Sequence, residues 1–459
     1  MSVRAIVLAA GQGTRMKSPL PKVLHEIAGK PLVSWVVEAV AAIEPDEITV
    51  VIGYGAEEVA AALPAGVRTV HQAEQLGTGH AVMVALAELG SVDGDTVVVL
   101  PGDSPLFRPE TLRNLVESHG GASATLLTAE LADPTGYGRV LREGERVVGI
   151  VEEKDADQGQ RAVGEVAVST YAFAGAALSA ALREVGSDNA QGEYYLTDAI
   201  AVMARDGEVR ATPAADADEV LGVNSHDQLA AAAATLRGRI NAHWMQAGVW
   251  MQDPERTYID AAVVLEPGAR IHADVHLLGG TTVGAGAEVG PSVLAADTTI
   301  GPEARIWYSV ARGAEIGRGA EVGPYASLRQ ESVLAEKAKV GTFVETKKTT
   351  IGSGSKVPHL SYVGDATIGE GTNVGAGTIT CNYDGVRKHP TTIGDRVFVG
   401  SDTMLVAPVT LGDDSTTGAG STITKDVPPG ALGVERSPQK VVPGYAAKRA
   451  RRAAREDDE

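Results

Sequence analysis

A glycine-rich turn near the start of the chain carries two basic residues, a combination suited to holding phosphate groups. The turn follows a short apolar run that ends at Leu8, and Gly11 and Gly13 leave backbone N–H groups open to an approaching anion. Arg15 and Lys22 add fixed positive charge beside it. The turn has neither the Gly-Lys-Ser/Thr ending of a P-loop nor the third glycine of a dinucleotide fingerprint. We therefore expect a triphosphate-binding turn of a different type.

Two further side chains could bring oxygen atoms to such a phosphate site. Asp103 lies just past an apolar run, and a carboxylate there can hold Mg²⁺ against the phosphates of a nucleotide. Asn224 could provide a second oxygen ligand. Each residue also has an ordinary structural explanation, since Asp103 could cap the turn before Pro105 and Asn224 could stand at the entry to a helix. The residues by themselves leave both explanations open.

The segment Gln72–Gly79 offers side-chain amides and an open backbone. Those groups suit the reading of a base edge by hydrogen bonds, although the same residues could form a plain loop.

The second half of the chain has one candidate general base. His359 follows a proline, and imidazole titrates near neutral pH, so this residue could take a proton from an ammonium whose amine attacks a thioester. A histidine packed against the scaffold is the alternative. The segment Gly375–Gly385 leads into a loop that interrupts the regular pattern of this half, and such loops often carry sites. Cys381 lies within that segment, where a small packed residue is favoured over a reactive thiol.

Composition narrows the class of protein. The chain has 459 residues, enough for two or three domains, and its formal net charge of −19 argues against nucleic acid as a partner. A single cysteine fits a reducing compartment, and no apolar run is long enough to span a bilayer or to suggest a leader peptide. We therefore expect a cytoplasmic protein with no membrane partner. The basic run that begins at Lys448, with the acidic residues after it, is expected to be a solvated or frayed tail.

The first half alternates apolar runs with helical stretches, which predicts a mostly parallel sheet covered by helices on both faces. The expected strands are Arg4–Ala9, Glu47–Ile52, Thr96–Leu100, Ala124–Thr128 and Val166–Phe173, and the expected helices are Ser34–Ala42 and Thr111–Ser118. Ligands of such sheets bind beyond the carboxyl ends of the strands, where the Gly11 turn and Asp103 both fall.

The second half repeats an aliphatic residue every six positions, a period that fits neither a helix nor a simple strand but does fit a hexapeptide β-helix. The repeat runs through Leu265, Ile271, Leu277, Val283 and Val289, then Leu294, Ile300 and Ile306, then Val310, Ile316, Val322, Leu328, Leu334 and Val340, with later members at Ile351, Val357, Val363, Ile393, Val399, Leu405 and Leu411. An alanine-rich stretch behind a capping box at Ser225–Gln228 predicts a connecting helix. We expect domains at 1–226 and 248–459, joined by a helix at 227–247.

Several motifs closely resemble one family. They are LAAGQGTRM with the following PK, QAEQLGTGHA, DPTGYGR, IVEEKDA and NAQGEYYLTD in the first half, and the segment from Leu328 to Pro408 in the second. They look like the bifunctional bacterial UDP-N-acetylglucosamine pyrophosphorylase and glucosamine-1-phosphate N-acetyltransferase, over essentially the whole chain. The resemblance implies an α/β nucleotidyltransferase domain with a Rossmann-like mixed sheet, followed by a left-handed parallel β-helix of hexapeptide repeats.

The resemblance also implies two reactions. The second half would acetylate glucosamine-1-phosphate with acetyl-CoA. The first half would then couple the N-acetylated product to UTP with the help of Mg²⁺, release pyrophosphate and give UDP-N-acetylglucosamine for cell-envelope synthesis. The implied partners are these small molecules, and the implied assembly is a homotrimer.

Site residues carried over from the family fall into two groups. In the first half, nucleotide binding is implied for Leu8, Ala9, Ala10, Gly11, Gln72, Gly77 and Thr78, catalysis for Arg15 and Lys22, sugar binding for Gly138, Glu152, Ala167 and Asn224, and Mg²⁺ binding for Asp103 and Asn224. In the second half, His359 is the implied base, the sugar phosphate is assigned to Arg329, Lys347, Tyr362 and Asn373, and acetyl-CoA to Ala376, Asn382, Tyr383, Ser401, Ala419 and Arg436. Lys388, in the interrupting loop, is a further candidate for contact with an anionic ligand.

Two other functions would fit parts of the sequence. A nucleotidyltransferase for adenylate or guanylate donors, with a β-helix used only for assembly, is disfavoured by His359 and the Asn382–Tyr383 loop. A non-catalytic subunit that binds nucleotide sugars is disfavoured by the joint presence of Lys22 and the proposed metal ligands.

The chain departs from the family at two places. Gln330 stands where the family commonly has proline, a minor change that leaves Arg329 in place. The larger departure is Ala167, because the family usually has asparagine after the Glu-Val pair and uses it to contact the sugar.

Alanine has no side-chain hydrogen-bonding group, so we predict weak binding of the sugar phosphate in the first half. The substitution Ala167→Asn should lower the KM for N-acetylglucosamine-1-phosphate by about five- to tenfold, the worth of one hydrogen bond, without changing the KM for UTP. Steady-state kinetics of pyrophosphate release would measure both constants. An unchanged KM for the sugar phosphate would contradict the prediction.

Overall fold

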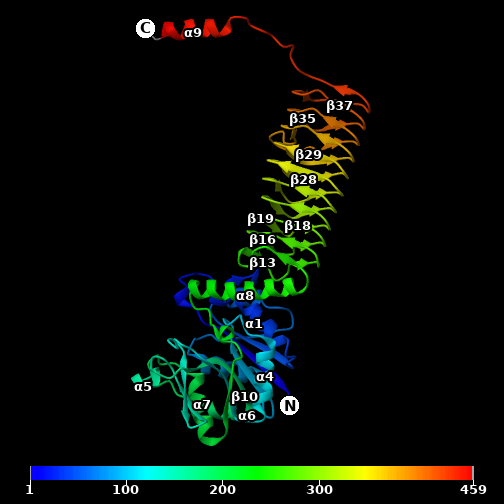
Figure 1. The fold of residues 1–459 in the computed structure, drawn as a ribbon. Coiled ribbons are helices and arrows are strands. Elements are labelled where there is room, and N and C mark those ends of the chain that lie inside the picture. Colours follow the sequence, from blue (N-terminus) through cyan, green and yellow to red (C-terminus); the bar gives the residue numbers. More distant parts are fainter. Residues whose placement is uncertain (1, 457–459) are drawn as a thin grey trace. The chain divides into compact units, whose positions relative to one another are not determined.

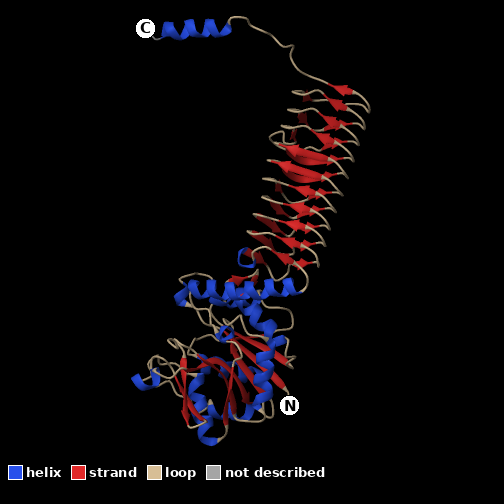
Figure 2. Cartoon of the chain, viewed as in Figure 1, coloured by secondary structure: helices blue, strands red, loops and turns tan. Residues whose placement is uncertain are grey.

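The computed structural model describes residues 2–456, and contacts between Cα atoms divide the chain into two compact units. Unit 1 holds the residues up to His243 together with Tyr258–Ala262, and unit 2 holds Trp244–Thr257 and the residues from Val263 onward. Figures 1 and 2 show an α/β arrangement in the first and stacked short strands in the second. Within the described residues, the search for a helix that is both long and apolar enough to cross a bilayer finds none.

Unit 1 is built on a mixed sheet in the order β11-β7-β10-β6-β1-β4-β5, with the β8–β9 hairpin attached through β10. Its strands are β1 (Val3–Ala9), β4 (Glu47–Ile52), β5 (Arg68–His71), β6 (Thr96–Pro101), β7 (Ala124–Glu130), β8 (Gly138–Glu143), β9 (Arg146–Val151), β10 (Glu165–Ala174) and β11 (Val209–Pro213). Strands β6, β1, β4 and β5 are parallel neighbours, whereas β10 runs antiparallel to both β6 and β7. The five strands and two helices expected from the sequence all form, and the sheet is mixed.

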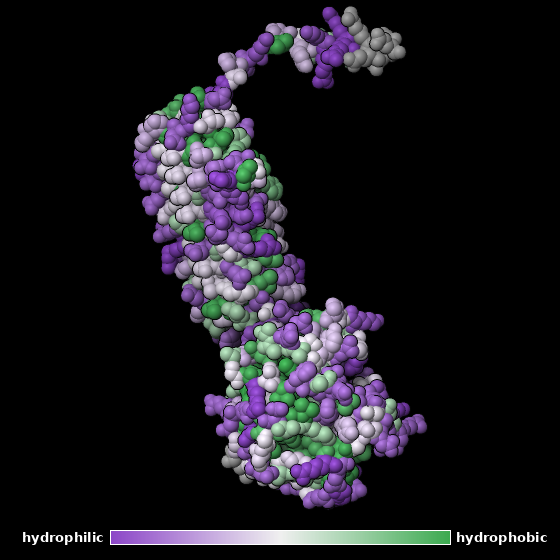
Figure 3. Space-filling model, turned by 180° about the vertical axis from the view of Figure 1, so that it is seen from behind, coloured by the Kyte–Doolittle hydropathy of each residue, from purple (hydrophilic) through white to green (hydrophobic). Residues whose placement is uncertain are grey.

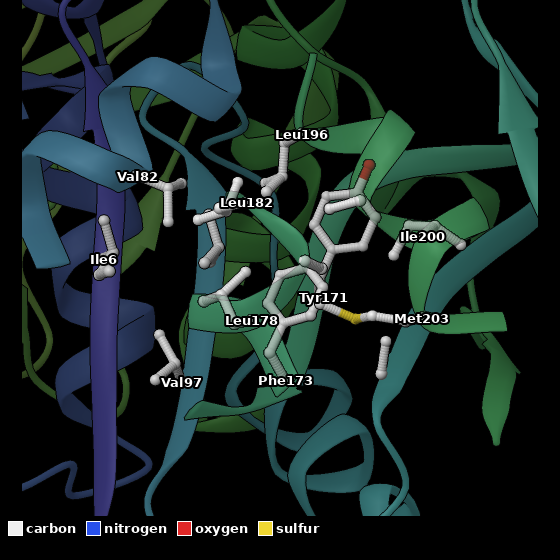
Figure 4. Close-up of a cluster of buried hydrophobic side chains, with 14 of the residues drawn as sticks. Ile6, Val82, Val97, Tyr171, Phe173, Leu178, Leu182, Leu196, Ile200 and Met203 are labelled. Carbon is white, nitrogen blue, oxygen red and sulfur yellow. The ribbon is translucent and has the colours of Figure 1, made fainter. Parts of the chain in front are cut away.

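Helices cover both faces of this sheet. They are α1 (Leu32–Ala41), α2 (Ala56–Ala61), α3 (Thr78–Leu89), α4 (Pro109–His119), α5 (Gln158–Arg161), α6 (Gly175–Ala181) and α7 (Leu196–Asp206). Side chains alternate along β1, so that Ile6 packs with α3, α6 and α7 while Val7 packs with α1 and α4 on the other face. Figure 4 shows the first of these cores, where the rings of Tyr171 and Phe173 stack at 5.3 Å between centroids.

Helix α8 (His226–Gln246) follows this domain. Its Ala232 and Leu236 are buried against Ile27, Leu106 and Val223, residues that lie within a few positions of Lys22, Asp103 and Asn224. The expected capping box is displaced by one residue, because the Gln228 side chain accepts a hydrogen bond at 2.8 Å from the backbone N–H of Asn224 rather than from that of Ser225.

Unit 2 is a parallel β-helix whose short strands stack into flat faces (Figure 2). One face is β12 (Trp250–Met251), β15 (Arg270–Ile271), β18 (Glu288–Val289), β21 (Arg305–Ile306), β24 (Glu321–Val322), β27 (Lys339–Thr342), β29 (Lys356–His359), β31 (Asn373–Val374), β34 (Phe398–Val399), β37 (Thr416–Thr417) and β39 (Leu432–Gly433). The other faces hold β14 (Val264–Leu265), β16 (Val275–Leu278), β17 (Thr282–Val283), β19 (Val293–Ala296), β20 (Thr299–Ile300), β22 (Val310–Arg312), β23 (Ala314–Ile316), β25 (Ser327–Leu328), β26 (Ser332–Leu334), β28 (Glu345–Ile351), β30 (Tyr362–Ile368), β32 (Ile379–Cys381), β33 (Thr391–Ile393), β35 (Met404–Val406), β36 (Val409–Leu411) and β38 (Thr422–Ile423).

Buried columns of aliphatic side chains run up the inside of the coil. Leu334, Ile351 and Ile368 occupy equivalent positions in successive coils, and all three are almost fully buried. Outward positions are hydrophilic over most of the face that Figure 3 shows.

The repeat predicted from the sequence is wrong at two positions. Leu294 and Val310 were expected to point inward, but both are half-exposed, and Ala295 and Ala311 take the buried positions opposite Leu277 and Leu328. The error arises because the coils differ in length: the step from Leu277 to Ala295 is eighteen residues and the next step, to Ala311, is sixteen.

Two further features interrupt or follow the regular coil. Residues 382–389 leave it as a loop, so that Ile368 pairs with Ile393 at a spacing of twenty-five residues. Beyond the coil, helix α9 (Tyr445–Glu456) forms where the sequence favoured a solvated or frayed tail, and its side chains are exposed as far as Ala453. The last acidic residues, 457–459, lie outside the described part of the chain.

The buried columns should carry much of the stability of unit 2. We expect Ile351→Ala to lower the free energy of unfolding by about 2–5 kcal/mol, because it leaves a cavity between Leu334 and Ile368. Its neighbour Thr350 is exposed, so Thr350→Ala should change that free energy by less than about 0.5 kcal/mol. Urea unfolding followed by circular dichroism would compare the two, and equal effects would contradict the prediction.

Candidate active sites

The loops at the carboxyl ends of β6, β1, β4 and β5 meet at one edge of the unit 1 sheet. The N–H of Gly102, after β6, donates to Leu8 O at 2.8 Å, and the N–H of Tyr54, after β4, donates to Ala10 O at 3.1 Å. Gly53 lies so close to Ala10 O and the Gln75 amide that an added Cβ would approach each to 2.8 Å. The predicted phosphate turn, the Asp103 loop and the Gln72–Thr78 segment are therefore neighbours, as the topology of parallel strands requires.

Lys22, Asp103 and Asn224 are in direct contact, although they lie far apart in the sequence. The Lys22 ammonium donates to Asp103 Oδ2 and, at 2.9 Å, to Asn224 Oδ1. Asp103 and Lys22 are largely buried, with side-chain exposures of 14% and 15%. The N–H of Val223 donates to Asp103 O at 2.9 Å and so ties the two loops together. A cation already sits between the two oxygens that the sequence analysis assigned to Mg²⁺, so these oxygens fit a positively charged ligand.

That donor set is small. Within the described residues, no three or more His, Cys, Asp and Glu side chains gather as a metal site. One carboxylate and one amide oxygen match the way Mg²⁺ is commonly held, with few protein ligands and the rest supplied by water and substrate phosphates. Arg15 is exposed in the same turn.

Tyr137 lies beside this cluster. Burial raises the pKa of its hydroxyl, a hydrogen bond with the Gly222 backbone opposes that shift, and the negative charge of Asp103 adds to it. Gly222 is itself close to Asp103 and Asn224, since an added Cβ would lie 3.9 Å from Asp103 Oδ1 and 3.7 Å from Asn224 Nδ2. Tyr137 thus connects the cluster with β8, which begins at the next residue.

The Gln72–Thr78 segment is held from two sides. Gln72 is buried, and its Nε2 group donates to Gly77 O at 3.2 Å and lies 3.0 Å from His80 Nδ1. Gly77 has φ = +105°, and Tyr194 O packs so closely that an added Cβ would come within 2.6 Å of it. The exposed Thr78 accepts a hydrogen bond from the backbone N–H of Leu196 at 3.1 Å.

Three of the four predicted sugar-binding residues also come together, whereas Asn224 lies in the Lys22 cluster. Ala167 pairs with Gly138 across β10 and β8, and an added Cβ on Gly138 would lie 3.7 Å from both carboxylate oxygens of Glu152. Glu152 accepts a hydrogen bond from Thr197 Oγ1 at 3.0 Å, and burial raises the pKa of its carboxyl. Ala167 is only 4% exposed and immediately precedes a bulge in β10.

In unit 2, the predicted base and acetyl-CoA residues line up along one corner of the coil. His359 is exposed at the end of β29, and its carbonyl accepts the N–H of Gly377 from the next coil. Ala376 O accepts the N–H of Asp402, and Ser401 O accepts the N–H of Gly420, each one coil further on. Ala419 O accepts a hydrogen bond from Arg436 Nη1 at 3.0 Å. His359, Ala376, Ser401 and Ala419 therefore occupy successive coils.

Positive charge gathers at another position of unit 2, where Lys347 pairs with Gly364, five residues beyond His359 along the coil. Lys347 lies beside Lys388, whose ammonium lowers the pKa of Lys347, with a further contribution from Arg329. Arg329 Nη1 also contacts Glu345 Oε1 at 2.7 Å. Repulsion among these cations raises their electrostatic energy until an anion binds to them. The cluster of Arg329, Lys347 and Lys388 therefore suits a phosphate group.

The remaining predicted residues of unit 2 lie on neighbouring strands and on the projecting loop. Tyr362, three residues after His359, has its hydroxyl 3.5 Å from Asn382 Nδ2, and Asn382 donates to Asp365. Asn373 pairs with Lys356 on the face that carries β29. Tyr383 is exposed, and its hydroxyl donates to Gly385 O at 2.6 Å.

Asp384 fixes the projecting loop. It accepts the N–H groups of Arg387 and Val386, and its Oδ2 lies 2.7 Å from His389 Nε2, contacts that lower its pKa to about 2. Burial raises the pKa of the Cys381 thiol, which fits a packed residue and not a reactive thiolate.

Three residues that contact predicted site residues were missed by the sequence analysis: Tyr137, His80 and Thr197. Each lies inside a motif quoted for the resemblance, namely DPTGYGR, QAEQLGTGHA and NAQGEYYLTD. Their partners lie eight or more positions away in the sequence, so spacing alone gave no signal of contact.

Comparison with known proteins agrees with the two-part architecture. Residues 5–191 match a MobA-like NTP transferase domain, and residues 390–425 match the bacterial transferase hexapeptide repeat. The chain is 49% identical to the bifunctional protein GlmU of Desulfitobacterium hafniense over 96% of its own length and 98% of that protein's. It is 51% identical to the GlmU of Streptomyces avermitilis, covering 97% and 94% of the two chains. It is 50% identical to the GlmU of Heliobacterium modesticaldum, covering 97% of its own length and 98% of that protein's.

The chain belongs to the GlmU family. The resemblance drawn from the motifs is thereby confirmed, as is the fold class of a nucleotidyltransferase domain followed by a left-handed β-helix. As a GlmU, the protein is a bifunctional enzyme with a uridylyltransferase half and an acetyltransferase half.

The buried carboxyl of Glu152 predicts a pH-dependent stability of unit 1. Its raised pKa means that ionisation lowers the free energy of unfolding at pH 7.5, and that this loss disappears as the pH falls through the folded-state pKa. Glu152→Gln should therefore raise the unfolding midpoint at pH 7.5, by about 2–4 °C for each kcal/mol recovered, with a smaller gain at pH 4.

The adjacent Glu153 serves as a control of opposite sign. It contacts Arg139 at 2.6 Å, and this hydrogen bond lowers its pKa. Glu153→Gln should therefore lower the midpoint at pH 7.5, and the loss should fade on acidification. Thermal unfolding at several pH values measures both variants, and a lower midpoint for Glu152→Gln at pH 7.5 would contradict the assignment.

Proposed function

We propose that unit 2 acetylates glucosamine-1-phosphate with acetyl-CoA and that unit 1 joins the N-acetylated product to UTP, giving UDP-N-acetylglucosamine. The contact of Lys22 with Asp103 and Asn224, beside a bare-backbone turn, carries the assignment of unit 1. For unit 2, the main support is the exposed His359 together with the cluster of Arg329, Lys347 and Lys388. Both sites take small, anionic substrates.

In unit 1, the phosphate oxygen of the sugar attacks the α-phosphorus of UTP and pyrophosphate leaves, with no covalent intermediate on the protein. Leu8–Gly11 receives the phosphates through its backbone, while Arg15 and Lys22 neutralise charge that develops on the leaving group. Gln72, Gly77 and Thr78 orient the base. The sugar is held by Gly138, Glu152, Ala167 and Asn224.

Asp103 and Asn224 would hold Mg²⁺, whose charge offsets that of the phosphates during the transfer. Because Lys22 donates to both of these side chains, its ammonium must give way as the metal and nucleotide bind, which leaves it free to meet the phosphates.

In unit 2, His359 takes a proton from the ammonium of glucosamine-1-phosphate, and the freed amine attacks the thioester carbon. A C–N bond forms, the C–S bond breaks, and the CoA thiolate takes up a proton as it leaves. Arg329, Lys347, Tyr362 and Asn373 bind the sugar phosphate, and Lys388 adds charge to that group. Acetyl-CoA lies along Ala376, Asn382, Tyr383, Ser401, Ala419 and Arg436.

A cytoplasmic homotrimer is part of the proposal. An exposed aromatic stack on unit 2 supports self-association: Tyr325 and Phe343 are 57% and 59% exposed, and their rings lie 5.6 Å apart. A groove of about 610 Å³, lined by Tyr308, Tyr325 and His276 among others, continues from this stack. Apolar surface of this kind is typical of a protein interface.

Substitutions at Asp103 and His359 should separate the two reactions. With glucosamine-1-phosphate, acetyl-CoA, UTP and Mg²⁺, release of thiol and of pyrophosphate would be measured in parallel. His359→Ala should reduce thiol release by about 10²–10⁴-fold, yet leave pyrophosphate release from preformed N-acetylglucosamine-1-phosphate intact. Asp103→Asn should do the reverse, with a loss of about 10²-fold or more in pyrophosphate release.

Asp93→Asn is the matched control for unit 1, because Asp93 is an exposed carboxylate in the loop before β6. It should leave both reactions unchanged. Loss of both reactions in either test variant, or full activity of His359→Ala in thiol release, would overturn the proposed assignment. Replacing UTP with ATP or GTP tests the alternative nucleotide classes, and neither should support pyrophosphate release.

A further inference from the structure

Gln72 is the buried amide of the proposed base site, and its orientation can be deduced from its neighbours. A backbone carbonyl can only accept hydrogen bonds, so the atom that faces Gly77 O at 3.2 Å must be Nε2 and not Oε1. The same Nε2 group lies 3.0 Å from His80 Nδ1. Its second hydrogen therefore points to His80, where Nδ1 acts as the acceptor.

These two contacts use both hydrogens of the Gln72 amide. Among the hydrogen bonds recorded between residues 2–456, none ends on Gln72 Oε1, and this oxygen is also absent from the buried atoms that lack a partner. The side chain can therefore offer a base only an acceptor.

Uracil has one hydrogen-bond donor on its Watson–Crick edge, the N3–H group, between two carbonyl acceptors. Cytosine has an acceptor at N3 and its donor at the exocyclic amine. An amide that can only accept must meet uracil at N3–H, and the same placement sets oxygen against the N3 lone pair of cytosine. A mismatch of this kind leaves polar groups unpaired, which is the strongest basis for rejecting a near-isosteric ligand.

We propose that His80 is a positioning residue that contributes to base specificity: its Nδ1, together with Gly77 O, holds the Gln72 amide with Oε1 presented to the base, and so favours uracil over cytosine. This inference rests on the proposed uridylyl transfer in unit 1 and on the role of Gln72 in that site. His80 itself acts through Gln72. It is half-buried near the start of α3, where its ring lies 6.4 Å from that of Tyr194.

The test compares UTP with CTP. For each variant, kcat/KM for pyrophosphate release is measured with both nucleotides and N-acetylglucosamine-1-phosphate, and the ratio of the two values is the readout. His80→Leu removes the acceptor at similar size, and the UTP/CTP ratio should fall about five- to thirtyfold, because only the contact with Gly77 O then opposes rotation of the Gln72 amide. His80→Asn keeps an oxygen acceptor near the position of Nδ1, so its ratio should stay within about twofold of the starting protein.

A role in packing alone would lower both kcat/KM values together and leave the ratio unchanged, which would overturn the proposal. An equal fall in the ratio for His80→Asn and His80→Leu would also overturn it, since the acceptor would then be irrelevant. His80→Ala repeats the test if leucine disturbs the contact with Tyr194.

A double-mutant cycle shows whether His80 acts through Gln72. In a Gln72→Ala background, His80→Leu should leave the UTP/CTP ratio unchanged, and a further fall there would contradict the mechanism. Thermal unfolding reports whether unit 1 is folded in each variant, and thiol release by unit 2 serves as an internal activity control. If the unsubstituted protein released no pyrophosphate from UTP while releasing thiol, the proposed function of unit 1 would fail, an outcome distinct from an unchanged ratio in an active enzyme.

Discussion

Parallel pairing of strands is the constraint on which both halves of this protein depend. Parallel strands end at the same edge of a sheet and need long connections to return to the start. In unit 1 the connections are helices, and the edge gathers the end of β1 at Leu8 with the loops that carry Gly53, Gln72 and Asp103. In unit 2 each connection is the remainder of one coil, so that a corner position recurs directly above itself. The same geometry thus yields a cluster of loops in one case and a column of residues in the other.

Electrostatics then distinguish the two proposed sites. In unit 1, Lys22 is neutralised by Asp103 before any ligand arrives, so the site is balanced and a second cation must displace the first. In unit 2, Arg329, Lys347 and Lys388 stand close together, although Glu345 partly offsets Arg329. Their mutual repulsion favours an incoming phosphate without any exchange. The first arrangement couples binding to a rearrangement, whereas the second is ready to accept an anion.

Much of the fold was predictable because it follows from local patterns. Apolar runs located five of the nine strands in the main sheet of unit 1, and the six-residue period located the β-helix. That period fails at Leu294 and Val310 because it assumes coils of constant length, whereas Ala295 and Ala311 show that length varies from coil to coil. The mixed character of the sheet came from the resemblance, since the direction of β10 leaves no mark on its own alternation of side chains.

The candidate sites were likewise predictable only where local patterns indicate them. Lys22, Asp103 and His359 could be singled out because their residue types and flanking motifs indicate chemistry. Their contacts could not, since the Lys22–Asn224 hydrogen bond joins residues 202 positions apart. Tyr137, Thr197 and His80 were missed for this reason: a tyrosine, a threonine and a histidine acquire a role only through the partner that folding places beside them.

The column of residues at one corner of unit 2 also sets the length of a molecule that binds along it. His359, Ala376, Ser401 and Ala419 lie in four successive coils, and neighbouring strands are about 4.8 Å apart. A molecule that touches all four must therefore be extended over about 14 Å, parallel to the axis of the coil. A long, narrow acyl carrier meets this requirement, while a compact acyl donor would reach no more than one or two of the rungs. Under the proposed assignment, the spacing of backbone hydrogen bonds along the coil therefore fixes how far the acyl donor must extend.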